Sequence, residues 1–383
     1  MPDFIRTREL ATSCLRRDGA ICYGGEKPQE RGTCTNRGDS TVTDHPIARR
    51  TVIKSAGIGL GAGLATGMIA AAAPTPAAAA QADIWSGEYW AHKGDVKLYL
   101  YRKRLGPPTT GEPPRPVLFM VHGSSNSSRS SYDLTVPGKG EYSMMNVFAG
   151  YGYDVWTMDH DGYGHSGSSG NSSDIASGVE DLKAAFPVIM QETGQQKMHM
   201  FGTSSGGIRA GAYAQTEPEH VDRLVLSAFT YKGTGAAEIG RRRDRIAELR
   251  ASPRRKRDAA MIRSIFTRDK HAEAYDPAVA EAIIAGEMKF GDTIPSGTYV
   301  DMAANLPLVD PTKVTCPVLM TRGEWDGNST NEDLIDFFLH LPNGDRQFVI
   351  LPHSAHAADI GKNRHLLWYA MKNFLAEPAP VAS

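Results

Sequence analysis

Short, mostly apolar runs recur from residue 117 onward, and longer stretches of helical character separate them. The runs cover residues 117–121, 154–158, 198–201, 224–226, 318–321 and 348–351, and the helical stretches cover residues 142–150, 174–193, 206–216, 331–341 and 357–375. Apolar runs of this kind are typical of parallel strands buried on both faces. The alternation predicts an α/β protein with a mostly parallel, doubly wound sheet, whose ligands bind at the carboxyl ends of the strands.

Two further segments, one before this pattern and one within it, add to the predicted architecture. Residues 84–90 and 95–104 are rich in aromatic and aliphatic side chains and flank a turn at 91–94, which predicts an N-terminal antiparallel hairpin. About ninety residues separate the strand ending near Ser227 from the strand starting near Pro317, far more than a crossover helix requires. We therefore expect a helical cap insertion.

The predicted domains follow from these boundaries. The core comprises residues 83–229 and 307–378, the cap spans residues 230–306, and residues 379–383 form a tail. Within the cap, residues 241–257 carry nine Lys or Arg against Asp244 and Glu248. A solvated helix face, broken at Pro253, is the favoured interpretation; a patch that attracts anionic substrates, polymers or lipid headgroups is the alternative.

The N-terminal part resembles an export signal. Arg49-Arg50 precedes residues 55–82, which contain no charge, are rich in Gly and Ala and end in the small-x-small pattern Ala80-Gln81-Ala82. Residues 49–82 therefore resemble a twin-arginine signal peptide cleaved before Asp83, which predicts a periplasmic or secreted protein without a stable membrane anchor. An uncleaved transmembrane anchor is the alternative, against which the glycines and prolines of the stretch argue. Residues 1–48 are interpreted as a disordered leader or a mis-assigned start.

The charge balance argues against a nucleic-acid-binding protein, and the cysteine content argues against an internal disulfide. The chain has 42 Lys and Arg against 43 Asp and Glu, a net charge of −1, so nothing suggests a nucleic-acid partner. Three of the four cysteines lie before residue 49, and only Cys316 would remain after cleavage. No internal disulfide is then expected. The oligomeric state is left open.

The most informative motif is Gly202-Thr203-Ser204-Ser205-Gly206, which follows a predicted strand and precedes a predicted helix. A Gly-x-Ser-x-Gly sequence in this context is typical of a sharp strand-to-helix turn that exposes a nucleophilic serine. Gly202 and Gly206 are required because side chains there would collide with the neighbouring strand and helix. Upstream, the strand at 117–121 runs directly into His122-Gly123-Ser124.

A serine hydroxyl is a poor nucleophile at neutral pH and needs an imidazole as base and a carboxylate that orients the imidazole. Candidate carboxylates Glu324 and Asp326 follow the strand at 318–321, and candidate imidazoles His353 and His356 follow the strand at 348–351. All four therefore follow strands whose carboxyl ends are expected to share one edge of the sheet with Ser204.

With these motifs in their order, the chain resembles the α/β-hydrolase-fold serine hydrolases of the esterase and lipase type, across residues 83–378. The resemblance implies Ser204 as nucleophile, Asp326 as acid and His356 as base, because the family has this chain order and places its acid three residues after a strand-end glycine, here Gly323. It also implies an oxyanion hole formed by the backbone N–H groups of Ser124 and Ser205.

Other polar residues near the motifs receive structural interpretations. The polar loop Ser124–Ser128 is expected to be a hydrogen-bonded loop, although a hydroxyl that assists the oxyanion hole is an alternative. The segment Asp159-His160-Asp161-Gly162-Tyr163-Gly164-His165-Ser166 resembles a structural loop of the family. No metal site and no cofactor are predicted, since no spaced third ligand accompanies His160 and Asp161.

The function predicted is an exported serine hydrolase that cleaves a small or oligomeric carboxylic ester through an acyl-enzyme. Relatives with the same triad imply alternatives, namely hydrolysis of a carbon–carbon bond beside a ketone, of a lactone or of an amide. A non-catalytic ligand receptor on the same fold is a further alternative.

Overall fold

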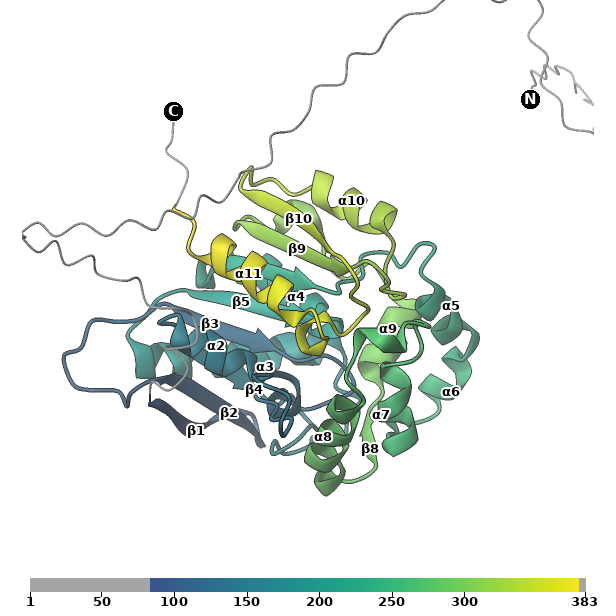
Figure 1. Cartoon of the computed structure of the whole chain (residues 1–383), viewed down its shortest axis with the longest axis horizontal. Helices are drawn as coiled ribbons and strands as arrows, with labels where there is room; N and C mark the ends of the chain where they lie inside the picture. The colour runs from purple at the N-terminus through teal and green to yellow at the C-terminus, as the bar shows by residue number, and fades with distance from the viewer. Residues whose placement is uncertain (1–82, 379–383) are drawn as a thin grey trace, which may run out of the picture. The chain divides into compact units, whose positions relative to one another are not determined.

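The computed structural model describes residues 83–378, in which an eight-stranded sheet has helices on both faces (Figure 1). Its strands run in the order β1-β2-β4-β3-β5-β6-β9-β10, where β2 is antiparallel to both β1 and β4 and all later neighbours are parallel. The bounds are β1 Ile84–Lys93, β2 Val96–Leu105, β3 Val117–Val121, β4 Asp154–Met158, β5 Met198–Thr203, β6 Val221–Ser227, β9 Val318–Gly323 and β10 Arg346–Leu351. The predicted mostly parallel sheet with an N-terminal hairpin is confirmed.

Side chains of the central strands alternate between two cores, one on each face of the sheet. On β3, Val117, Phe119 and Val121 belong to one core, whereas Leu118 and Met120 belong to the other. The first core is covered by α3 Ile175–Thr193, α4 Ser205–Thr216 and α10 Asn331–Leu339, and the second by α2 Met144–Gly150 and α11 Arg364–Leu375, while the short α1 Ser128–Tyr132 follows β3. This burial on both faces explains why the strands read as unbroken apolar runs.

One predicted helix differs at its start. The stretch 357–375 is helical only from Arg364, and its first part forms a short 3₁₀ turn at Ala358–Ile360 instead. In this turn Ala358 and Ile360 are buried in different apolar clusters, and Asp359 between them is buried as well. The 3₁₀ turn thus places these three side chains in the interior, and the regular helix begins only at Arg364.

The chain between β6 and β9 forms a separate group of elements beside the sheet, at the right of Figure 1. These are α5 Ala237–Asp244, α6 Ile246–Arg250, β7 Arg254–Lys256, α7 Ala259–Ile265, α8 Pro277–Glu287, β8 Thr293–Pro295 and α9 Gly297–Ala304, with β7 and β8 paired in a small antiparallel sheet. We call this group the cap. The predicted solvated face at 241–257 is wrong for Arg242 and Arg257, both of which are buried.

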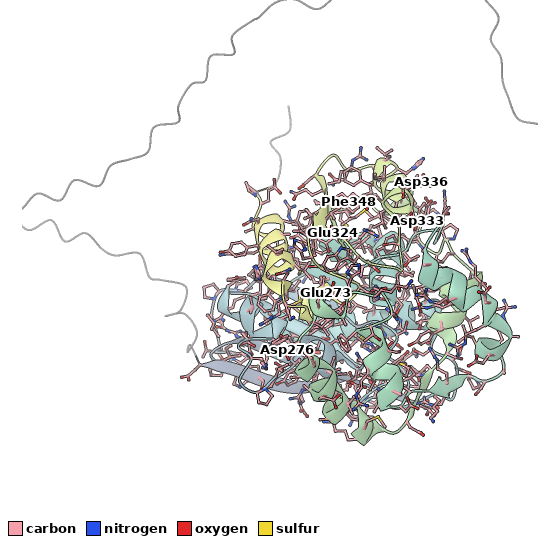
Figure 2. All side chains as sticks on the ribbon, turned by 45° about the vertical axis from the view of Figure 1, so that its right-hand side comes forward. Glu273, Asp276, Glu324, Asp333, Asp336 and Phe348 are labelled. Carbon is pink, nitrogen blue, oxygen red and sulfur yellow. The ribbon has the colours of Figure 1, made fainter. Side chains whose placement is uncertain are left out.

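Polar contacts join the cap to the core at its start and near its end. The Asp333 carboxylate on α10, labelled in Figure 2, accepts four main-chain N–H groups from the chain that enters the cap, residues 231–234. Glu287, at the end of α8, accepts hydrogen bonds from the N–H and hydroxyl of Ser127 and pairs with buried Arg257. A buried carboxylate is tolerated when it has such partners, so these contacts hold the cap in a defined position.

Helices that are long and apolar enough to span a bilayer are absent from the described residues. The predicted leader, signal peptide and C-terminal tail, residues 1–82 and 379–383, lie outside the described residues.

Candidate active site

Ser204 lies at the sharp turn between β5 and α4, at the carboxyl edge of the sheet. Its backbone has φ 57° and ψ −127°, a conformation that side-chain-bearing residues rarely adopt. A Cβ atom on Gly202 would lie 2.4 Å from the Gly206 carbonyl oxygen, and one on Gly206 would lie 2.1 Å from the Val121 carbonyl oxygen. The two glycines therefore allow β3, β5 and α4 to approach closely around the turn.

The structure brings Ser204, His356 and Asp326 together in one hydrogen-bonded row. Ser204 Oγ lies 3.1 Å from His356 Nε2, and His356 Nδ1 lies 2.8 Å from Asp326 Oδ1. A carboxylate can only accept, so Nδ1 carries the proton that it donates to Asp326. Nε2 is then the free acceptor that faces the serine hydroxyl.

Asp326 is held in its ionised form. Burial by itself would raise the pKa of this carboxyl, but the charge and hydrogen bond of His356 and the N–H of Asn328, 2.8 Å from Oδ1, together hold the pKa below its usual range. The side-chain amide of Asn328 also lies 3.4 Å from His356 Nε2. Asn328 was not expected at the site, and it is a second donor that can occupy Nε2 when the serine hydroxyl turns away.

The two rival residues lie elsewhere. Glu324, labelled in Figure 2, accepts a hydrogen bond from the main-chain N–H of His353 at 2.8 Å and has no contact with His356. His353 packs edge-on against Trp325 at a ring distance of 5.5 Å. The structure therefore places neither rival beside Ser204.

The two predicted oxyanion donors lie next to the nucleophile. Ser205 is the first residue of α4, so its N–H has no helical acceptor, and Ser124 follows Gly123 in the loop after β3. A Cβ on Gly123 would lie 3.2 Å from the Thr203 carbonyl oxygen, which shows how closely this loop packs on the end of β5. The Ser124 and Ser205 side-chain hydroxyls are 2.6 Å apart, so a hydrogen bond links the two residues whose main-chain N–H groups are the predicted donors.

Hydroxyl groups of α9 extend this contact into the cap. Thr298 Oγ1 donates to Ser124 Oγ at 2.8 Å, and Ser125 Oγ lies 2.7 Å from the Tyr299 hydroxyl. The Ser124 hydroxyl is therefore engaged with two partners, as expected for a hydrogen-bonded loop. This network of hydroxyl groups holds the loop in place.

A buried histidine pair supports the same loop from behind. His122 Nε2 accepts the His160 N–H at 3.1 Å, which leaves His122 Nδ1 as the donor to the Gly123 carbonyl oxygen at 2.8 Å. Burial, helped by the charge of Arg209, lowers the pKa of His122 to about 4, so the ring is neutral. Burial likewise lowers the pKa of His160, whose Nδ1 contacts the Asp181 carboxylate at 3.0 Å.

The predicted structural loop that begins at Asp159 behaves as one. Asp159 accepts the N–H and hydroxyl of Ser128 and the N–H of His165.

Within residues 83–378, the one group with metal-ligand spacing is Glu217, Glu219 and His220, just beyond the C-terminal end of α4. A helix of 12 residues is about 18 Å long, so this group is remote from Ser204.

Beside Ser204 lies a small cavity of about 70 Å³. Two of its charged lining residues come from positions that the sequence did not single out, and a third belongs to the basic run at 241–257. Arg242 and Arg268 belong to the cap, and Asp359 to the 3₁₀ turn after His356. Burial raises the pKa of the Asp359 carboxyl to about 6. No periodicity or motif marks Arg268 and Asp359, and the basic run does not distinguish Arg242 from its neighbours, because packing between distant segments brings all three residues to the site.

The geometry satisfies the requirements of nucleophilic catalysis at a carbonyl group. A base lies within hydrogen-bond reach of a hydroxyl, a carboxylate orients the base, and the residues of the two predicted N–H donors, Ser124 and Ser205, line the site or follow the serine directly. Such a site can add a serine to a carbonyl carbon and stabilise the resulting oxyanion.

Curated proteins align with parts of this chain. Over 112 residues it is 32% identical to a 2-hydroxy-6-oxononadienedioate/2-hydroxy-6-oxononatrienedioate hydrolase of Paraburkholderia phymatum, an alignment that covers 28% of this chain and 34% of that protein. Over 158 residues it is 29% identical to Lipase 3 of Drosophila melanogaster, covering 38% of this chain and 39% of that protein. The alignments thus span little more than a third of each curated relative.

Solved structures show the same fold. One example is the 2-hydroxy-6-oxo-6-phenylhexa-2,4-dienoate hydrolase from Rhodococcus sp. strain RHA1, which has a TM-score of 0.54 at 17% sequence identity; the match covers 76% of this chain and all of that one. The predicted α/β-hydrolase fold is thereby confirmed.

A family model matches most of the described chain. The match runs over residues 112–358 and so contains the Ser204 turn, the whole cap and both other members of the hydrogen-bonded row. The chain therefore belongs to the Hydrolase_4 family, described as serine aminopeptidase, S33.

Proposed function

We propose that the protein hydrolyses carboxylic esters through an acyl-enzyme formed on Ser204. The observation that carries this proposal is the row in which Ser204 Oγ is 3.1 Å from His356 Nε2 and His356 Nδ1 is 2.8 Å from Asp326. A serine placed at a strained turn, with a base that already has the right tautomer, is prepared for attack without rearrangement.

The reaction would proceed in two stages. Ser204 attacks the ester carbonyl carbon while His356 takes the hydroxyl proton, and the N–H groups of Ser124 and Ser205 stabilise the oxyanion. His356 then gives the proton to the leaving alcohol, which leaves the acyl group on Ser204. In the second stage His356 deprotonates a water molecule that attacks the acyl-enzyme. His356 then returns this proton to the Ser204 oxygen as the acid leaves. Asp326 keeps its charge throughout and stabilises the imidazolium.

The test combines covalent labelling with turnover. A fluorophosphonate probe should label the wild-type protein on the peptide that contains Ser204, and p-nitrophenyl esters should be turned over. The Ser204→Ala variant should lose both properties, because the hydroxyl is the bond-forming group. Labelling with no product release from any ester would instead favour a ligand receptor, and full activity of the purified Ser204→Ala variant would sink the assignment.

A second candidate is hydrolysis of a carbon–carbon bond beside a ketone. The observation in its favour is the 32% identity to a hydrolase named for an oxo-dienedioate, a ketone rather than an ester. A β-diketone tested beside esters, a lactone and an amide separates the two reactions, since each candidate predicts a different preferred class.

We also propose that the enzyme acts outside the cytoplasm. The support is the Arg49-Arg50 pair, the uncharged stretch 55–82 and the Ala80-Gln81-Ala82 site. N-terminal sequencing of the protein recovered from the periplasm or medium should begin at Asp83. A protein that stays cytoplasmic with residues 1–82 attached would refute this.

A further inference from the structure

A second, larger cavity lies among the elements of the cap, with Ser125 as its one lining residue from the core, and it shares part of its wall with the cavity beside Ser204. It has a volume of about 650 Å³, within the range of small-molecule sites. Arg242, Arg268, Ser125 and Ile265 line both cavities. The wall shared by the two cavities therefore carries two guanidinium groups.

These two arginines share one carboxylate. Glu238 Oε1 lies 3.3 Å from Arg242 Nε and 3.9 Å from an Arg268 terminal nitrogen, while Glu238 Oε2 pairs with Arg241 at 2.8 Å. Burial by itself would raise the pKa of Glu238, but Arg268, Arg242 and Arg241 together lower it, so this carboxylate is already ionised. One negative charge thus faces three positive charges, which leaves an excess of positive charge at this wall.

Arg268 is the least satisfied of the group. Its side chain is 16% exposed, its Nε is buried, and Nε has no hydrogen-bond partner within residues 83–378. Burying a guanidinium N–H without an acceptor is costly, and an oxyanion is the ligand that removes this cost best, because a carboxylate can accept two parallel N–H bonds. Arg242 is better anchored, since it also contacts the sulfur of Met302 at 3.1 Å.

The chain next to Arg268 is tied to the triad. The carboxylate of Asp269 accepts the main-chain N–H of His356 at 3.2 Å, so Arg268 is held at a fixed place beside the base. Its other oxygen is buried close to Gly327, where a Cβ would lie 2.7 Å away. Asp359 lines the smaller cavity too, but no oxygen of it lies within 4.0 Å of an Arg268 or Arg242 nitrogen in the described part of the chain.

We propose that Arg268, with Arg242, forms a subsite for a carboxylate carried by the substrate, so that the preferred ester is anionic. The proposal rests on the ester hydrolysis proposed above and names its substrate class. The ester carbonyl lies at Ser204, and the carboxylate replaces water at the wall shared by the two cavities. The substrate is then a half-ester of a dicarboxylic acid or an ester of comparable charge.

The test compares half-esters with the corresponding diesters, in which a second ethyl ester replaces the free carboxylate. Monoethyl esters of glutaric, adipic, pimelic and suberic acid are offered to the purified protein, and the corresponding diethyl esters are the neutral controls. The expected result is a kcat/KM at least tenfold higher for the half-ester at one chain length, equivalent to about 1.4 kcal/mol. Arg268→Gln should lower the ratio of half-ester to diester by at least tenfold, and Arg268→Lys should keep part of it because the charge remains.

Arg245→Gln is the matched control, because Arg245 lines the larger cavity but pairs with Glu248 at 2.7 Å on an exposed surface. Its ratio should stay within twofold of wild type. Calorimetry with monoethyl adipate on Ser204→Ala gives a readout without turnover, and binding should be lost when Arg268→Gln is added.

The outcomes separate the two proposals. Turnover of diesters with a ratio unaffected by Arg268→Gln overturns the carboxylate subsite and leaves the ester hydrolase. Binding of the half-ester through Arg268 without turnover of any ester supports the subsite and overturns the hydrolase.

Discussion

Replacing Ser204 by glycine should stabilise the protein relative to replacing it by alanine, although both variants lose the nucleophile. Ser204 has φ 57° and ψ −127°, and a residue in such a conformation stores about 1–3 kcal/mol of backbone strain. Alanine keeps this strain, whereas glycine relieves it at an entropic cost of about 0.5–1 kcal/mol in the unfolded chain. With the middle of each range, the expected difference in the free energy of unfolding is about 1 kcal/mol in favour of Ser204→Gly.

Reversible urea unfolding of both variants, fitted with a common m-value, measures this difference. Both lose the same hydroxyl contact with His356, so this loss cancels in the comparison. The control pair is Ser264→Gly and Ser264→Ala on the exposed face of α7, where ordinary helical geometry should make glycine less stable by about 1 kcal/mol. If Ser204→Gly is as unstable as Ser204→Ala, or less stable, the strain argument is refuted.

Further predictions concern the turn, the acid and the buried carboxyl. Gly206→Ala should fail to fold or lose more than about 4 kcal/mol of stability, because the added Cβ would lie 2.1 Å from a carbonyl oxygen of β3; Gly240→Ala, with open space around its Cβ, should fold normally, and soluble yield and urea midpoints measure both. Asp326→Asn should lower kcat by about 10³–10⁴-fold because an amide orients the wrong histidine tautomer, whereas Glu324→Gln should stay within about threefold of wild type; the reverse pattern would make Glu324 the acid. The Asp359→Asn variant should become more stable relative to wild type as pH rises, because wild type itself loses stability. The folded protein holds the Asp359 pKa at about 6 against 3.8 in the unfolded chain, so wild type loses stability between these values and stays at the lower level above pH 6. The full loss is about 3 kcal/mol at most, and equal stability profiles of variant and wild type from pH 4 to pH 8 would contradict it.

Much of the core and of the triad geometry was accessible from local sequence. Strands buried on both faces read as apolar runs, and the residues that chemistry requires follow directly after those strands. Gly202 and Gly206 were informative because close backbone approach admits no other residue there. At such positions the local sequence alone is enough to predict the local structure.

The cap and the walls of the cavities were not accessible in this way. Arg242 appeared within a run of basic residues that reads as a solvated face, yet it is buried because Glu238 and Met302 meet it. Asp359 lies where a helix was expected, and its burial depends on packing around His356. These environments arise from segments far apart in sequence, so no window of residues contains the information.

The contacts between the cap and the loop at residues 124–128 matter for any exchange of the cap between homologues. Thr298 and Tyr299 of the cap hold the hydroxyls of Ser124 and Ser125, and Glu287 holds Ser127. A chimera that exchanges the cap for that of a homologue would remove all three anchors at once and leave the loop to find new ones. A donor cap should therefore be transplanted together with the donor's own loop at 124–128, so that the contacts between cap and loop are kept.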